Sequence, residues 1–213
     1  MGAAATKVAK KLNEIMTDIY GSNEVTDPEF CIMAIGDLYC DHSPIQISQF
    51  ESDTRIAEQL DKVYFEFGGG GNDWESYTAA WYMGLNHCKL DCWNRGKKGI
   101  IITLGDEEFN PYLQATELNE VTGDTNQTNI DSKELYKEAI EKFDIYHISV
   151  NDRESSYSRN NRNHEVDDSW INAIGKDNYF IANLDNLSST ISDIITRNTD
   201  TFTNNSTVTP ISW

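Results

Sequence analysis

Basic residues are scarce in this chain of 213 residues. Lys and Arg total 17 against 35 Asp and Glu, which gives a formal net charge of -18. A surface with this excess of negative charge repels phosphate backbones and anionic membrane surfaces. The composition therefore argues against nucleic acid and membrane as partners and favours a divalent cation or a basic protein. A purely solubilising role for the charge stays open.

Long apolar runs and cysteines are scarce too. No apolar run approaches the roughly 18 residues that span a bilayer, and the N-terminus lacks the charged-then-apolar plan of a secretion signal. Cys88 and Cys92 stand one helical turn apart beside His87, with Cys31 and Cys40 elsewhere. Zinc binding by this group stays open, but packing and loop roles are favoured. We therefore expect four reduced cysteines and a cytoplasmic protein.

Apolar strand patterns alternate with amphipathic helix patterns along the chain. Strands are predicted at 30–36, 45–50, 100–104, 145–150 and 179–182, and helices at 3–20, 53–63, 77–85, 112–121, 134–142, from 167, and at 184–195. The 45–50 strand alternates with period two, so we expect a half-exposed edge strand that forms a hairpin with the strand before it. The near-continuous apolar runs indicate parallel strands buried on both faces.

This alternation predicts an α/β fold with a Rossmann-like, doubly wound and mostly parallel sheet that has one antiparallel edge strand. We expect one domain over residues 1–198, followed by a flexible polar tail over 199–213.

Glycine-rich or acidic segments follow three of these apolar runs. They are Gly36-Asp37 to Asp41, the turn Gly68 to Ser76, and Gly105-Asp106-Glu107. Ligands of doubly wound sheets bind at the carboxyl ends of the strands, and a glycine-rich turn before a helix leaves backbone N–H groups free. The three segments therefore predict a ligand site at one edge of the sheet.

The same three segments carry a resemblance to a known family. Gly68-Gly-Gly-Gly-Asn-Asp-Trp-Glu75, the strand ending in Leu104-Gly105-Asp106-Glu107, and the Gly36-Asp37-x-x-x-Asp41 hairpin resemble the von Willebrand factor A (vWA) domain. The closest similarity is to its intracellular branch in bacterial, phage and alpha-kinase-associated proteins. The resemblance implies a protein-interaction module with a divalent cation, usually Mg²⁺, at a metal-ion-dependent adhesion site (MIDAS).

The resemblance is incomplete at the N-terminus. Family members carry an Asp-x-Ser-x-Ser loop after a first, central strand, whereas this chain opens on Met1-Gly2-Ala3 where that loop ends. The missing strand would lie between the strands that start near Phe30 and Ile100. A truncated or late-started sequence, a strand supplied by another chain, and an adapted fold are the alternatives.

The resemblance implies a set of site residues. Asp106 matches the family's metal-ligating Asp, and no Thr occupies the usual place in the second loop, so Asn72, Glu75 or Ser76 would substitute. Asp37 is a further candidate ligand, although Asp37 and Asp41 also suit Asx-turns. Candidate partner contacts are Trp74, Asp73 and Glu107. Without the first loop, we expect low occupancy by Mg²⁺.

Two other functions stay open. Acid clusters with Mg²⁺ can hydrolyse phosphoesters, so a metal-dependent phosphoesterase is the alternative to an interaction module. However, the chain has no Gly-x-Ser-x-Gly elbow and no Gly-x-x-x-x-Gly-Lys loop, and we expect a non-enzyme. A structural subunit of a phage or secretion assembly is the other possibility.

Overall fold

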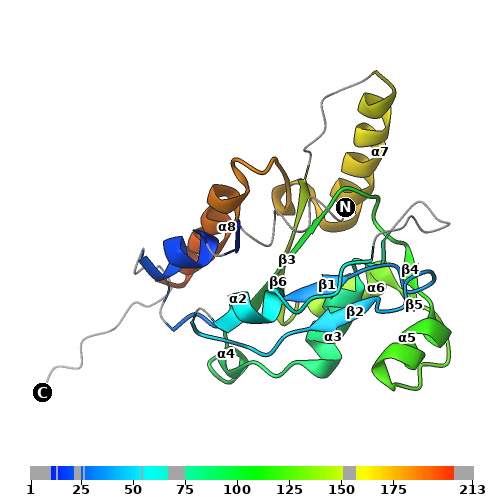
Figure 1. Ribbon diagram of the computed structural model, residues 1–213, viewed down its shortest axis with the longest axis horizontal. Helices are drawn as coiled ribbons and strands as arrows, with labels where there is room; N and C mark the ends of the chain where they lie inside the picture. Colours follow the sequence, from blue (N-terminus) through cyan, green and yellow to red (C-terminus); the bar gives the residue numbers. More distant parts are fainter. Residues whose placement is uncertain are drawn as a thin grey trace, which may run out of the picture.

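The computed structural model describes residues 11–12, 14–21, 25, 27–53, 55–66, 75–150 and 157–203. The strands are β1 (Met33–Ile35), β2 (Ile45–Ile47), β3 (Gly99–Gly105), β4 (Tyr112–Leu113), β5 (Ile130–Asp131), β6 (Phe143–Val150) and β7 (Tyr179–Ala182). The helices are α2 (Arg55–Leu60), α3 (Ala79–His87), α4 (Asp91–Asn94), α5 (Ala115–Thr122), α6 (Ser132–Ala139), α7 (Tyr157–Ile174), the 3-10 turn η1 (Lys176–Asn178) and α8 (Leu187–Thr203) (Figure 1). Residues 14–21 are also helical.

A parallel sheet in the order β3-β6-β7 forms the centre of the fold. Gly99 pairs with Phe143 and Gly105 with Ser149, and β7 continues the sheet by pairing with the second half of β6. The expected α/β class and these three strands are confirmed. Parallel strands need a crossover between them, and the helices α6 and α7 lie in the two connections.

The first two strands form a separate antiparallel hairpin, in which Met33 pairs with Ile47 and Ile35 with Ile45. The expected hairpin is confirmed. The expected strand over 30–36 is too long, because only three of its residues join the ladder and they are partly exposed. Phe30 pairs with Glu51 in an isolated bridge. Among the described residues, neither β1 nor β2 is hydrogen-bonded to the parallel sheet.

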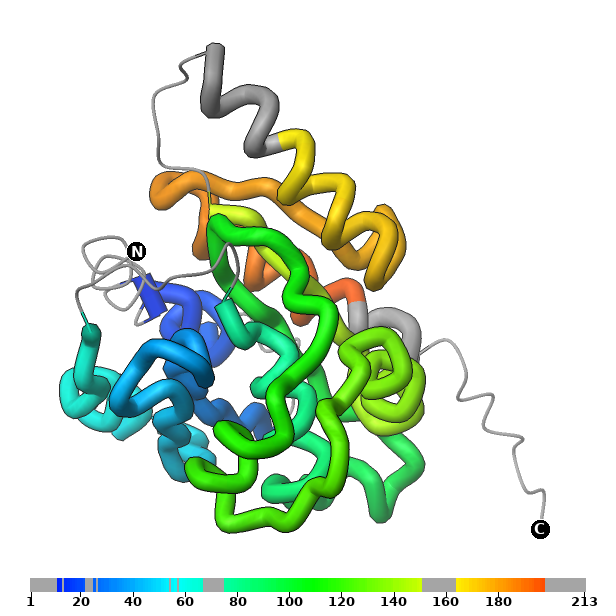
Figure 2. The backbone as a smooth tube through the Cα atoms, turned by 90° about the vertical axis from the view of Figure 1, so that its right-hand side faces the viewer, coloured from blue at the N-terminus to red at the C-terminus, as the bar shows by residue number. Residues whose placement is uncertain are grey.

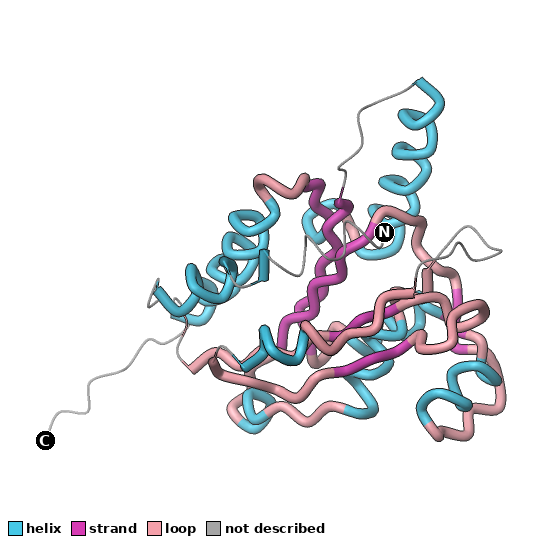
Figure 3. Tube along the Cα trace, viewed as in Figure 1, coloured by secondary structure: helices cyan, strands magenta, loops and turns pink. Residues whose placement is uncertain are grey.

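Helices cover both faces of the parallel sheet (Figure 3). On one face, side chains of α3, α6 and α7 pack with Ile101 and Ile145 around the fully buried Trp81 and Trp170. On the other face, α8 and the 14–21 helix pack against Ile148, with Ile15 and Ile19 each 1% exposed. The hairpin contributes to the first core through Met33, Ile35 and Ile45. Figure 2 shows the hairpin, in blue, at the left of the green and yellow-green strands.

Several predicted boundaries are wrong. Helix α7 begins at Tyr157, ten positions before the expected start at 167, in a segment that has no apolar periodicity. Helix α8 runs to Thr203, so the predicted polar tail begins inside it. The short β4–β5 ladder precedes α5 and α6 in a region expected to be helix and loop. Among the described residues, no helix is long and apolar enough to cross a membrane.

Candidate functional site

The first segment of the site is the loop that follows β1. The Asp37 N–H donates to Asp41 Oδ2 at 2.8 Å, and the Tyr39 N–H donates to Asp37 Oδ1 at 3.0 Å. The second bond is the Asx-turn that suits Asp at such a position. Gly36 is required here, because a Cβ on it would lie 2.1 Å from Asp41 Oδ2. The two aspartates therefore shape the loop, and one carboxylate oxygen of each accepts a backbone hydrogen bond within it.

The second segment, before α3, is tied to that loop through Ser76. The Ser76 N–H donates to Gly36 O at 3.3 Å, and its Oγ accepts from the Leu38 N–H at 3.0 Å. Ser76 is only 7% exposed. Its hydroxyl oxygen, which we predicted as a metal ligand, therefore holds the two segments together. Asn72, Asp73 and Trp74 lie outside the described residues, as do the four glycines before them.

The third segment is the end of β3. Gly105 is required because a Cβ on it would lie 2.1 Å from the Tyr77 hydroxyl oxygen. The Trp170 indole N–H donates to Glu107 O at 3.1 Å, so a residue of α7 holds the chain that follows the strand. Asp106 and Glu107 are both partly exposed at this end of the sheet.

The three segments bring together five carboxyl groups, which we call the carboxylate cluster: Asp37, Asp41, Glu75, Asp106 and Glu107. Burial raises the pKa of Glu75 to about 7, and the negative charges of Asp41, Asp37, Glu107 and Asp106 add to the shift. Burial also raises the pKa of Tyr77 above its ordinary value, with Asp106 and Glu75 as further causes. The predicted convergence of these segments is therefore correct for their acidic residues.

The cluster contains buried carboxylate oxygens that have no hydrogen-bond partner among the described residues. Asp37 Oδ2 and Glu75 Oε2 are examples, and Asp37 as a whole is only 4% exposed. A buried anionic oxygen without a partner is costly unless a cation or a proton compensates it. This end of the sheet is therefore chemically suited to a positive charge.

The fit to a metal ion is partial. Within the described part of the chain, no group of three or more His, Cys, Asp or Glu side chains is arranged to hold a metal ion directly. Mg²⁺ keeps several of its waters and is bound through only one or two carboxylates. The described side chains therefore do not enclose a metal ion, and a cation held here would have to keep part of its water shell.

A buried aromatic layer lies beneath the cluster. The His147 ring stacks on Trp170 with centroids 3.6 Å apart, and its Nδ1 lies 2.8 Å from Thr103 Oγ1. Burial lowers the pKa of His147 well below its ordinary value, so the ring is neutral at physiological pH. Tyr77 contacts both rings edge-on. These contacts give His147 a structural role within the core. Tyr77, which is adjacent to Ser76 in sequence, links this aromatic layer to the cluster.

The alternative zinc group does not assemble in the described residues. His87 Nε2 lies 2.7 Å from Asp124 Oδ2, which also accepts a hydrogen bond from the Tyr82 hydroxyl at 2.6 Å. Those two hydrogen bonds lower the pKa of Asp124. Cys88 is buried, and all four cysteines are free, as expected.

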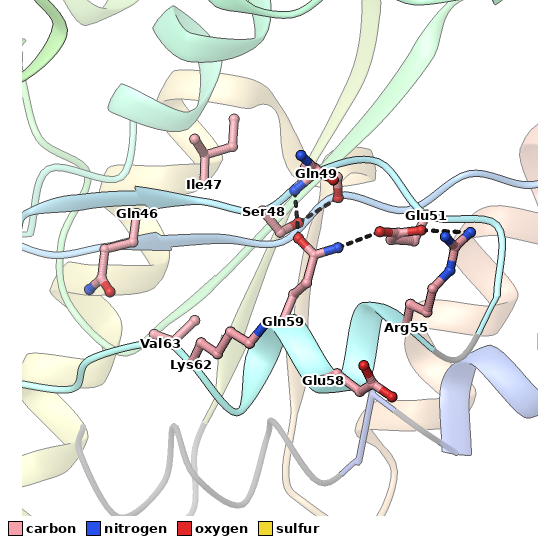
Figure 4. Close-up of a pocket in the computed structure, with 10 residues that line it drawn as sticks. All are labelled: Gln46, Ile47, Ser48, Gln49, Glu51, Arg55, Glu58, Gln59, Lys62 and Val63. Atoms are coloured by element: carbon pink, nitrogen blue, oxygen red, sulfur yellow. Dashed lines mark hydrogen bonds and ion pairs between the residues drawn. The ribbon is translucent and has the colours of Figure 1, made fainter.

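A polar groove of about 530 Å³ lies away from the cluster, between β2 and α2 (Figure 4). Its side chains bond one another: Gln59 Nε2 donates to Glu51 Oε1 at 2.6 Å, and Arg55 pairs with Glu51 at 3.0 Å. The Gln49 N–H donates to Gln59 Oε1 at 2.7 Å. The polar groups of Gln59, Glu51 and Arg55 are therefore occupied with one another.

Comparison with known proteins identifies no relative: no protein-family model matches the chain, and no curated protein or solved structure matches it significantly. The resemblance to the vWA domain therefore stays a prediction that depends on the three segments described above.

Proposed function

We propose that this chain is a protein-interaction domain of the vWA type, with a cation-binding face at the carboxyl end of β3. One observation carries the proposal: acidic residues of three separate segments gather around the buried Glu75, where Asp37 Oδ2 and Glu75 Oε2 lack hydrogen-bond partners among the described residues, and burial together with the neighbouring negative charges raises the pKa of Glu75 to about 7. Concentrating like charges in this way is unfavourable unless a positive group is bound there for part of the time. The net charge of -18 adds to the attraction of any cation.

The cation would be a hydrated Mg²⁺. Asp37, Glu75 and Asp106 would face it, with Asn72 and Ser76 as the further predicted ligands. An oxygen-rich site of this kind suits a hard divalent cation. When bound, the ion supplies a positive charge through which a partner's carboxylate can attach. The chain's own residues position the site, because Ser76 joins two of its segments and Trp170 anchors the third.

We also propose that the two strand groups are parts of one doubly wound sheet, in the order β2-β1, a gap, and β3-β6-β7. The support is that they share their cores. Met33 of β1 and Ile101 of β3 join the same cluster, while Phe30 and Ile102 join the cluster on the opposite face. The gap corresponds to the strand that the vWA resemblance places at the centre. In keeping with the free cysteines, we place the protein in the cytoplasm.

The cation proposal is tested by thermal unfolding with and without MgCl₂, at constant ionic strength and pH 8. Removing a charge from the cluster should weaken the effect of the ion, so we expect Mg²⁺ at millimolar concentration to raise the Tm of the wild type more than that of Glu75→Gln. The matched control is Glu138→Gln, which makes the same change at an exposed position of α6. It should respond as the wild type does.

An equal Mg²⁺ response in all three proteins would contradict the cation site, since nonspecific screening of the net charge affects them alike. Assays with generic phosphoesters test the enzyme alternative on the same samples. Turnover that disappears in Asp106→Asn would replace the interaction domain with a metal-dependent phosphoesterase.

A further inference from the structure

The outer edge of β3 is open in the described part of the chain. The strand pairs with β6 on one side, and no described strand pairs with it on the other. Its sequence, Gly99 to Gly105, contains no charged residue and no proline. Natural edge strands are usually protected by charges, prolines, bulges or a covering element, because an unprotected apolar edge recruits another strand.

The hydrogen-bonding groups on this edge can be assigned. The Gly99 N–H donates to Lys142 O at 3.0 Å, on the β6 side. Backbone groups of successive residues in a strand point to opposite edges, so Ile101 and Thr103 also face β6. The N–H and C=O groups of Ile100, Ile102 and Leu104 therefore face the open edge, where the described residues offer them no backbone partner.

The outer edge of β2 differs from the open edge of β3. Along β2, Gln46 Nε2 donates to Tyr64 O at 2.8 Å, and the Tyr64 N–H donates to Gln46 Oε1 at 2.9 Å. The side chain of Gln46 thus replaces the strand that would otherwise pair there. No comparable side chain closes the open edge of β3 among the described residues.

Both faces beside the open edge are apolar. The side chain of Ile101 joins the core on the α3 side, and those of Ile102 and Leu104 join the core on the α8 side, yet all three stay partly exposed. A strand placed alongside β3 would complete both cores with its own side chains. Such a strand must be apolar on both faces.

The charges at the two ends of β3 indicate which charged residues should stand at the ends of the incoming strand. Lys97 and Lys98 precede β3, whereas the carboxylate cluster follows it. An incoming strand should therefore carry its basic residue at the end that meets the cluster, near the buried Asp37 Oδ2 and Glu75 Oε2, to which the described residues donate no hydrogen bond. A second copy of this chain fits poorly, because each copy has a net charge of -18.

We propose that an extended apolar segment of another polypeptide pairs with the open edge of β3, with a basic residue beside the carboxylate cluster. The interaction domain would thus bind its partner by strand addition, in which backbone hydrogen bonds supply affinity and side chains supply specificity. It rests on the strand edge and holds whether or not a cation binds the cluster.

The first test is amide exchange of the full chain by NMR, without partner and with EDTA present. We expect the amides of Ile100, Ile102 and Leu104 to exchange much faster than those of Ile101 and Thr103. Equal protection of both sets at all protein concentrations would show that the chain itself covers the edge. Protection that grows with concentration would assign the edge to a second copy. Either outcome overturns the proposal, and neither bears on the cation.

The second test uses synthetic peptides of about ten residues, a length typical of strands, with a central run of valine and isoleucine that ends in lysines. We expect binding that protects the amides of Ile100, Ile102 and Leu104. A peptide with N-methylated alternate residues keeps its side chains but cannot pair, so it should bind at least about tenfold more weakly. A peptide with glutamates in place of the lysines should also be weaker.

A matched pair of variants tests the edge from the side of the protein. Ile102→Pro removes an N–H that faces the open edge and leaves the bonds to β6 in place, whereas Ile102→Ala shortens the same side chain and keeps the N–H. The proline variant should lose peptide binding and the alanine variant should retain it. Equal peptide binding by the two variants would overturn the proposal, and so would equal binding of the N-methylated peptide and its parent to the wild type. If Ile102→Pro does not fold, the comparison of the two peptides decides.

Discussion

Strands β3 and β6 pair residue for residue but are covered differently. Strand β6 lies between β3 and β7, and most of its side chains are buried. Strand β3 has one neighbouring strand within the described ranges, and its isoleucines at 100, 101 and 102 are all partly exposed. Both are apolar runs that predict a strand buried on both faces. The burial of such a strand therefore depends on whether strands lie on both sides of it, because an apolar side chain is covered by adjacent strands as well as by helices.

The largest expected effect compares Leu104 with Ile148, which are partners in the register. Ile148 is fully buried, with 0% exposure, whereas Leu104 is partly exposed. We expect Ile148→Ala to lower the free energy of unfolding by about 3–4 kcal/mol and Leu104→Ala by only about 1–2 kcal/mol. Urea denaturation followed by circular dichroism measures both.

Equal losses of unfolding free energy in Ile148→Ala and Leu104→Ala would contradict the proposed difference between the two strands. They would mean that β3 is as well covered as β6 in the isolated chain. A leucine in α5, Leu118, serves as a reference because it is fully buried and belongs to neither strand. Leu118→Ala should lose as much stability as Ile148→Ala.

The next effect concerns the charge that collects at the end of β3. The folded pKa of Glu75 is about 7, above the ordinary value of 4.5. The folded protein therefore holds this proton more tightly than the unfolded chain does, and stability falls as the pH rises from the ordinary pKa through 7. Gln cannot ionise, so Glu75→Gln should be more stable than the wild type at pH 8. We expect its free energy of unfolding to be higher by about 1–2 kcal/mol, after allowance for solvent screening.

At pH 5 the difference in free energy of unfolding between Glu75→Gln and the wild type should nearly vanish, because Glu75 is then protonated in the folded protein. Denaturation curves at both pH values measure this, with Glu138→Gln as the control for the loss of one negative charge. The cluster's other carboxylates, Asp37, Asp41, Asp106 and Glu107, remain in both proteins. A gain that is the same at both pH values would show that the repulsion around Glu75 is not its cause.

The smallest effect concerns the closed edge of β2. Gln46→Ala removes both hydrogen bonds to the backbone of Tyr64, at an exposed site. We expect a loss of about 1 kcal/mol or less, together with faster amide exchange at Tyr64. Gln127→Ala is the matched control, because Gln127 donates only to Thr125 O within its own loop. If the Tyr64 amide exchanges equally in both variants, the glutamine does not close this edge.

The sequence predicts much of the fold and part of the site. Parallel strands at 100–104, 145–150 and 179–182 follow from their apolar runs. The acids that gather around Glu75 come from the end of β3, from the loop after β1 and from the segment before α3, so the shared edge of the parallel sheet explains only the place of Asp106 and Glu107. The early start of α7 was missed because its first turns have no apolar periodicity, and the β4–β5 ladder was missed because its two-residue strands leave no pattern. For Asp41 the sequence favours a turn role over a role as an additional ligand, and the structure shows that its charge also acts on Glu75.

The sequence by itself determined the fold class, the main parallel strands and the acidic character of the edge where they end, because these depend on local periodicity and composition. Only the tertiary structure decided that Ser76 joins two segments. It also decided that, within the part of the chain that the structure describes, Asp37 and Glu75 bury oxygens without hydrogen-bond partners and β3 has an open edge. Those properties depend on hydrogen-bond partners and charges that are distant in the chain. Local patterns along the chain carry no information about such contacts.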